Sequence, residues 1–170
     1  EIERSTFSIA AVRKTAEQKE LLHQNSYDLD QKITNIASLR ESTPTEWQEI
    51  IALCQKQNGY LDECSKKRWP LPKLSNSNIG AIIARFSHYA TMEKVDRSIS
   101  AGANSLNSNR VYKQFIADCS QQMKNIGTCQ ENGWSIPRLI NADPDRIKAN
   151  AEKEKAQKDK AAKVKRKHDC

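Results

Sequence analysis

An internal repeat without gaps is the feature of this sequence that most restricts its fold. Residues 51–74 align with residues 116–139, and eight of the 24 positions are identical. The identities include both cysteines of each segment, a tryptophan and a proline: Cys54/Cys119, Cys64/Cys129, Trp69/Trp134 and Pro72/Pro137. Repeated units usually bury a face that they share with a neighbour. We therefore predict one helical domain, residues 1–141, made of two units at about 8–75 and 76–141, and a charged tail at 142–170.

Upstream of residue 51 the alignment is weaker. Trp47 still aligns with Tyr112, and His23 aligns with His88 at the same offset. A shift of one residue is then needed to pair Asp30 with Asp96. The first half of each unit has therefore diverged more than the second half.

The spacing of apolar residues within each unit is typical of α-helices. Trp47, Ile50, Ile51 and Cys54 lie at i, i+3, i+4 and i+7, which is one face of a helix. The segment Thr43-Pro44-Thr45-Glu46 supplies an N-cap, a first-turn proline and a capping-box glutamate. A similar spacing predicts long helices from about Ser8 to Leu39 (Val12, Ala16, Leu22, Leu29, Ile33, Ile36) and after Ser77/Asn78 (Ile79, Ile82, Ile83, Phe86, Ala90, Val95).

Composition supports an all-α class with a thin core. Only 37% of the residues are hydrophobic, 6% are aromatic, and the mean hydropathy is −0.80. Five glycines and five prolines are too few for the many turns of a β-sandwich or barrel. We predict that each unit contains one long helix followed by a shorter pair of helices, with Gly59 ending the first helix of its pair.

The cysteines form two Cys-x9-Cys pairs, and Cys170 is left over. Structural zinc sites use closer cysteines, and His23, His88 and His168 form no catalytic motif with a thiol, so disulfide bonds are the better account. Ten residues of helix span about 15 Å, whereas a disulfide needs Cα atoms within about 7 Å, so a local bridge requires a turn. We predict that Cys54–Cys64 and Cys119–Cys129 each close a helical hairpin. Cys170 is interpreted as a free thiol, an intermolecular link or a residue foreign to the natural chain.

The Leu61-x-x-Cys64 and Ile126-x-x-Cys129 segments also resemble the twin Cys-x9-Cys proteins of the mitochondrial intermembrane space. The resemblance covers only the two cysteine segments. It implies the pairing Cys54–Cys129 with Cys64–Cys119, oxidative import, and a structural or assembly role. Whether the bridges lie within or between units stays open at this point.

The positive charge is concentrated at the end of the chain. Residues 146–170 hold ten Lys or Arg and four Asp or Glu, whereas the rest holds 18 and 17. Asp143-Pro144 is a helix start, but beyond Ile147 only alanines and Val164 are apolar, so we predict a solvated, fraying helix and thus a partly helical tail. The tail either solubilises the chain or binds an anionic surface of nucleic acid or lipid through Lys153, Lys155, Lys160, Lys163, Lys165, Arg166 and Lys167.

Two segments of the form Trp-x-x-Pro-(Lys/Arg)-Leu follow the second cysteine of each unit. Each indole either covers its own helical pair or belongs to a surface that binds a protein partner. In the second interpretation, the binding residues are Trp69 and Lys73 in one unit and Trp134 and Arg138 in the other.

Known catalytic motifs are missing from the sequence. It has no glycine-rich phosphate loop, His-Glu-x-x-His helix, nucleophile elbow or run of about 18 apolar residues. We predict no catalytic residues, metal or cofactor. Because the chain begins at Glu1, we expect a processed or trimmed form that has lost a signal peptide. The favoured function is a non-enzymatic, disulfide-stabilised interaction module of the periplasm or of a secreted protein; the alternative is nucleic-acid association through the tail.

Overall fold

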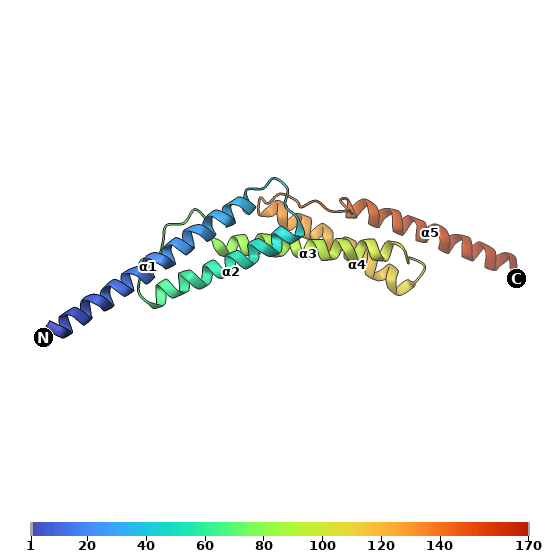
Figure 1. Ribbon diagram of the computed structural model, residues 1–170. Helices are drawn as coiled ribbons and strands as arrows, with labels where there is room; N and C mark the ends of the chain where they lie inside the picture. Colours follow the sequence, from blue (N-terminus) through green and yellow to red (C-terminus); the bar gives the residue numbers. More distant parts are fainter. Residues whose placement is uncertain (1, 170) are drawn as a thin grey trace. The chain divides into compact units, whose positions relative to one another are not determined.

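The chain folds entirely into helices and connecting segments. The computed structural model describes the backbone of residues 2–169 and the side chains of residues 9–168, so Cys170 lies outside the described residues. The helices are α1 (Ile2–Ala37), α2 (Pro44–Lys66), α3 (Ile79–Ala103), α4 (Asn109–Glu131) and α5 (Pro144–Asp169), as Figure 1 shows. The described backbone contains no strand, and the all-α prediction is confirmed. None of the described helices is apolar enough over a sufficient length to cross a bilayer.

α2, α3 and α5 begin where the sequence places capping residues, whereas α1, predicted from about Ser8 to Leu39, runs from Ile2 to Ala37. Thr43 and Glu46 form a reciprocal capping box at the start of α2. Asn78 Oδ1 accepts a hydrogen bond from the backbone of Ala81 in α3, and Asp143 Oδ1 accepts one from Arg146 in α5. These side chains satisfy N–H groups that have no partner within the first helical turn.

The predicted hairpin between Cys54 and Cys64 is wrong. α2 is continuous from Pro44 to Lys66 and passes through Gly59 without a break, and α4 is likewise continuous from Asn109 to Glu131. A single interior glycine costs a helix only about 1 kcal/mol, and α2 packs along α1 over this region. Packing against the neighbouring helix therefore outweighs the local preference of Gly59.

Contacts within the chain group its residues into two compact units, whose bounds differ from those predicted from the repeat. Unit 1 is residues 1–87 and unit 2 is residues 88–170. The division falls inside α3, so residues 79–87 of that helix belong to unit 1 and the remainder belongs to unit 2. Unit 1 therefore contains α1, α2 and the first turns of α3, and unit 2 contains the rest of α3, α4 and α5.

Each unit has its own row of buried side chains. In unit 1 these are Leu22, Leu29, Ile33, Ile36, Trp47, Ile50, Cys54, Cys64, Ile79 and Phe86. In unit 2 they are Tyr89, Met92, Ile99, Phe115, Cys119, Cys129 and Ala151. The predicted apolar face of α1 is buried only from Leu22 onward, because α1 extends past the end of α2 (Figure 1) and Val12 is 68% exposed.

Candidate functional site

The segments that follow α2 and α4 are the best-defined irregular parts of the molecule. We call residues 67–78 and 132–143 the anchored segments. At their starts, Trp69 N donates to Cys64 O and Trp134 N donates to Cys129 O, both at 2.9 Å. The residue before each tryptophan has a positive φ, 56° at Arg68 and 69° at Gly133. Each helix therefore ends in a left-handed residue that turns the chain back toward the helix pair.

A buried carboxylate holds the far end of the first anchored segment. Asp30 of α1 accepts hydrogen bonds from Ser75 N at 2.8 Å and Asn76 N at 3.0 Å. The side-chain nitrogen of Asn76 donates to Asp30 Oδ1 at 2.8 Å and to Thr34 Oγ1 at 2.7 Å. The segment is thereby tied to α1 by both its backbone and a side chain.

The second anchored segment is held by a matching set of bonds. Asp96 of α3 accepts from Ile140 N at 2.8 Å and from Asn141 N at 2.9 Å. Asn141 Nδ2 donates to Asp96 Oδ1 at 2.9 Å and to Ser100 Oγ at 2.8 Å. The donors of the two units occupy equivalent positions of the repeat, and the acceptors do so after the one-residue shift that the alignment requires.

The middle of each segment is held by a ring on the preceding long helix. His23 Nε2 donates to Pro70 O at 2.8 Å, and Tyr89 Oη donates to Ser135 O. The counterpart of His23 in these contacts is therefore Tyr89, whereas the sequence alignment paired it with His88. His88 instead bonds through Nε2 to Asn125 O at 2.9 Å and packs against the Trp134 ring.

The environment of Asp30 favours its ionised form. Burial alone would raise the pKa of this carboxyl, but the hydrogen bonds from Ser75 and Asn76 lower it, and the net pKa lies below the ordinary value of 3.8. The anchor is therefore a carboxylate at neutral pH, and charge-assisted bonds of this kind are stronger than neutral ones.

The anchored segments expose apolar and basic side chains at matching positions. Leu71 is 56% exposed and Ile136 is 47% exposed. The predicted binding residues Lys73 and Arg138 are also exposed, whereas Trp69 and Trp134 are half-buried. Each tryptophan thus lies in the same segment as its predicted basic partner.

Trp69 also borders an open hollow in unit 1. The hollow is about 310 Å³ and is lined by side chains of α1, α2 and the anchored segment, among them Leu21, Tyr60, Glu63, Lys67 and Trp69. Lys67 Nζ lies 4.8 Å from the centre of the Trp69 ring. The hollow thus brings together an indole, a lysine, a glutamate and the side chain of Leu21.

The predicted disulfides are absent from the structure. None of Cys54, Cys64, Cys119 and Cys129 forms a disulfide bond, and all four are buried. Cys54 and Cys64 lie ten positions apart on one unbroken helix, which separates them by about 15 Å along its axis. Burial raises the pKa of the Cys54 thiol to about 11, and it also raises the pKa of Cys119. These thiols therefore act as small core residues that are poorly suited to nucleophilic chemistry.

The basic tail residues all lie on α5. Lys155 is half-buried, with Nζ 4.7 Å from the centre of the Tyr112 ring, and the other predicted tail residues are exposed. The prediction of a wholly solvated helix is wrong for the first turns of α5, where Ala151 is buried in a cluster with Ile99, Phe115 and Cys119. Small side chains on α5 let it approach α4 closely enough to bury alanine.

The residues that anchor the two segments were not recognised from the sequence. Asn76 and Asn141 are identical at equivalent positions of the repeat, and Asp30 and Asp96 align after the one-residue shift. That recurrence was the available signal. The recurrence does not show that the aspartate and the asparagine of one unit are in contact, because they lie 46 positions apart in unit 1 and 45 positions apart in unit 2.

Within the described residues, no group of three or more His, Cys, Asp or Glu side chains is arranged to hold a metal ion. Comparison with protein-family models, with curated proteins and with solved structures finds no match to this chain. The interpretation of the site therefore depends on its geometry.

Proposed function

We propose that this chain is a non-enzymatic helical module that binds a protein partner through its two anchored segments. The observation that carries the proposal is the exposure of Leu71 and Ile136 on segments that are otherwise fixed at both ends. Each segment also presents a half-buried tryptophan and an exposed basic residue. Tryptophan and arginine are frequent sources of binding energy at protein interfaces.

The hydrogen bonds around Asp30 and Asp96 support a recognition role because they remove conformational freedom before a partner arrives. A loop that is already ordered loses less entropy on binding than a mobile loop does. Isolated exposed apolar residues are common on protein surfaces and need no explanation by themselves. Here the exposed residue, the tryptophan and the basic residue recur together at equivalent positions of the repeat.

The proposal does not depend on an oxidising compartment. The expected periplasmic or secreted location was derived from paired cysteines, and the free thiols of this structure give it no support. The absence of disulfide bonds likewise gives no support to the pairing Cys54–Cys129 with Cys64–Cys119 that the mitochondrial resemblance implies. Location stays a prediction, separate from the binding surface.

Site-specific photocrosslinking in cells that naturally express the protein tests the proposal. A photoreactive residue placed at position 71 or at position 136 should give a crosslinked product of one and the same mass. The exposed position Lys113 on α4 serves as the matched control and should give none.

A double variant, Leu71→Asp with Ile136→Asp, should remove crosslinking from a probe placed at position 73. Val12→Asp is its control, because Val12 is 68% exposed and lies on α1, outside both anchored segments. Equal crosslinking from position 113, or no product from either segment, would contradict the proposed function.

A further inference from the structure

α5 starts as a structural counterpart of α3. α3 begins at Ile79 and α5 at Pro144, and these two residues occupy equivalent positions of the repeat. Both helices are capped by a side chain of the preceding residue, and both follow an asparagine that bonds a buried aspartate. In each helix, the first and eighth residues are buried and the fourth and fifth are half-buried. The first turns of α5 therefore pack in unit 2 as the first turns of α3 pack in unit 1.

Beyond the eighth residue the two helices differ completely. α3 continues with Tyr89, Met92, Asp96 and Ile99, all of which are buried. In α5, every described residue from 152 to 168 except Lys155 is exposed. The second part of α5 therefore keeps the position of a repeat helix but has lost the side chains that a neighbouring helix would cover.

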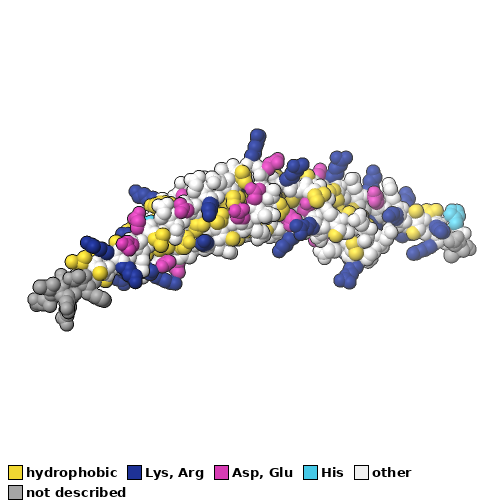
Figure 2. All heavy atoms as spheres, in the orientation of Figure 1, with side chains coloured by type: hydrophobic (Ala, Val, Ile, Leu, Met, Phe, Trp, Pro, Cys, Tyr) yellow, Lys and Arg dark blue, Asp and Glu magenta, His cyan; other side chains and the backbone are white. Residues whose placement is uncertain are grey.

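Basic residues have taken the place of that apolar face. Between residues 152 and 168 there are eight Lys or Arg and three Asp or Glu. Among the described residues, the ion pairs lie along α2 and its C-cap and within α3, and none involves α5. Figure 2 shows the dark blue side chains that project along α5, at the right of the view. This stretch, residues 152–168, which we call the basic arm, thus has five more basic than acidic side chains and no ion pair among the described residues.

The distribution of the charges around the basic arm restricts the partner. Each residue turns the helix by about 100°, so the exposed lysines at 153, 158, 160 and 163 point to different sides. A helix that lies on a membrane needs an apolar face, and the basic arm offers only alanines and Val164. It contains no Phe, Tyr or Trp on which single-stranded bases would stack.

The dimensions and charge of the basic arm fit the major groove of double-stranded DNA. A helix with its side chains is about 10–12 Å wide, and the groove is about 12 Å wide with phosphates along both edges. Lysines on opposite sides of a helix in this groove reach phosphates of both strands. The deep, narrow major groove of A-form RNA does not admit such a helix.

We propose that the basic arm, residues 152–168, binds the phosphate backbone of double-stranded DNA without reading its sequence. The first turns of α5, packed on α4, hold the arm as a helix that continues beyond the buried cluster of unit 2. The arm and the anchored segments are formed by different residues, so either proposal can fail without the other.

Fluorescence anisotropy of a labelled 25-base-pair duplex, titrated with the full chain between 50 and 200 mM salt, tests this inference. The test variant carries Lys→Gln at 158, 160, 163 and 165. The matched control carries Lys→Gln at the exposed positions 14, 32, 94 and 113 and has the same net charge. Glutamine keeps helix propensity close to that of lysine, and circular dichroism checks that all three proteins have the same helix content.

The unmodified chain should bind with an affinity that falls steeply with salt. The slope of log K against log salt should be less steep in the test variant by about 3–4, because each phosphate contact contributes about 0.9. The control variant should keep the original slope. Equal losses in the two variants, binding that does not depend on salt, or equally tight binding to anionic lipid vesicles would overturn the inference.

Discussion

Units 1 and 2 share the hydrogen bonds that hold the ends of the anchored segments, but they fill part of their apolar cores with different residues. Asp30 and Asp96 make the same set of bonds to the anchored segments, and Gln57 and Gln122 each donate to a backbone carbonyl of the preceding long helix. The buried cysteines are the same in both units, but three other apolar positions differ: Ile36, Ile50 and Phe86 correspond to Gly102, Phe115 and Ala151.

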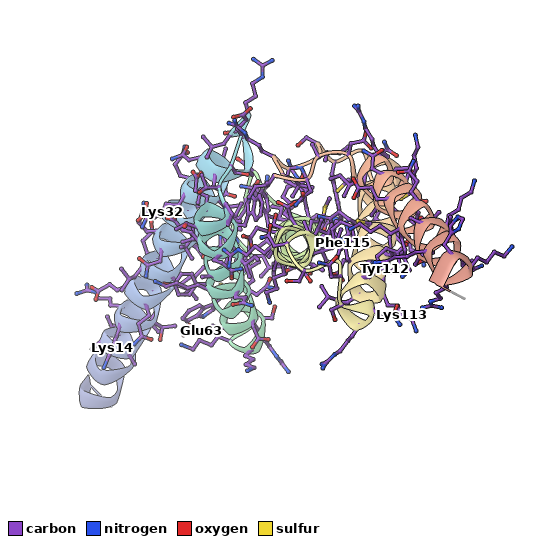
Figure 3. The ribbon with its side chains drawn as sticks, turned by 90° about the vertical axis from the view of Figure 1, so that its right-hand side faces the viewer. Lys14, Lys32, Glu63, Tyr112, Lys113 and Phe115 are labelled. Carbon is purple, nitrogen blue, oxygen red and sulfur yellow. The ribbon has the colours of Figure 1, made fainter. Side chains whose placement is uncertain are left out.

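The difference has a physical cause. A buried hydrogen bond to a backbone group requires one donor or acceptor at one position, so few residues can replace it. Apolar contacts tolerate exchanges that conserve the local volume. Gly102 and Phe115 illustrate such an exchange, since a Cβ at Gly102 would lie 3.2 Å from the Phe115 ring. In Figure 3, Phe115 lies on the α3 side of α4 and Tyr112 on the side of α5.

The largest expected effect comes from giving unit 1 the alanine of unit 2. Phe86→Ala should lower the free energy of unfolding by about 3–5 kcal/mol, because Phe86 is buried and its truncation leaves a cavity among its neighbours. Urea unfolding followed by circular dichroism measures the change. Phe86→Leu should lose much less, and an equal loss in the two variants would show that packed volume is not the cause.

Removal of either anchoring carboxylate should have a large and similar effect in the two units. Asp30→Asn and Asp96→Asn should each cost about 1.5–3 kcal/mol, because an amide cannot accept both backbone bonds and places an NH2 group against one of the donors. Urea unfolding again measures the cost. Asp28→Asn, at an exposed position on α1, is the control and should have little effect; a large difference between the two anchors would break the comparison.

Placing the isoleucine of unit 1 into unit 2 should have a smaller effect that a second substitution reverses. Gly102→Ile should cost about 1–3 kcal/mol through overpacking against Phe115. The double variant Gly102→Ile with Phe115→Ile recreates the pair found in unit 1 and should recover most of the loss. A double-mutant cycle measures this coupling, and additive losses would contradict volume compensation.

Acid should weaken the anchor of unit 1 only at low pH. The pKa of Asp30 is lowered in the folded protein, so its stabilising effect is complete above the ordinary value of 3.8 and is lost as pH falls through the folded value. The difference in unfolding free energy between the unmodified chain and Asp30→Asn should therefore shrink in this range. Stability curves at pH 7, 5, 4 and 3 measure it, and a difference that grows on acidification would contradict the assignment.

The starts of α2, α3 and α5 were predictable because their signals are local. Thr43, Asn78 and Asp143 each lie within three residues of the backbone group that they cap. The failure at Gly59 has the opposite cause. Its local signal favours a helix end, but α2 is stabilised along its length by packing against α1, which no short segment reveals.

The cysteines and the anchors were harder to interpret because the same pattern fits different structures. Recurrence of Cys54 and Cys119 fits a disulfide, but it equally fits a small buried side chain at an equivalent core position. The alignment of Asp30 with Asp96 could be seen in the sequence. The role of these carboxylates as anchors depends on Asn76 and Asn141, which the fold brings within hydrogen-bond distance of them. Only the three-dimensional contacts connect these residues.

Amide hydrogen exchange tests the central claim, that the same bonds fix both anchored segments. The amides of Ser75, Asn76, Ile140 and Asn141 donate to the two carboxylates and should be strongly protected in the native chain. Asp30→Ala should remove protection at residues 75 and 76 while residues 140 and 141 stay protected, and Asp96→Ala should do the reverse. Exchange at the unprotected rate in the native chain would contradict the account.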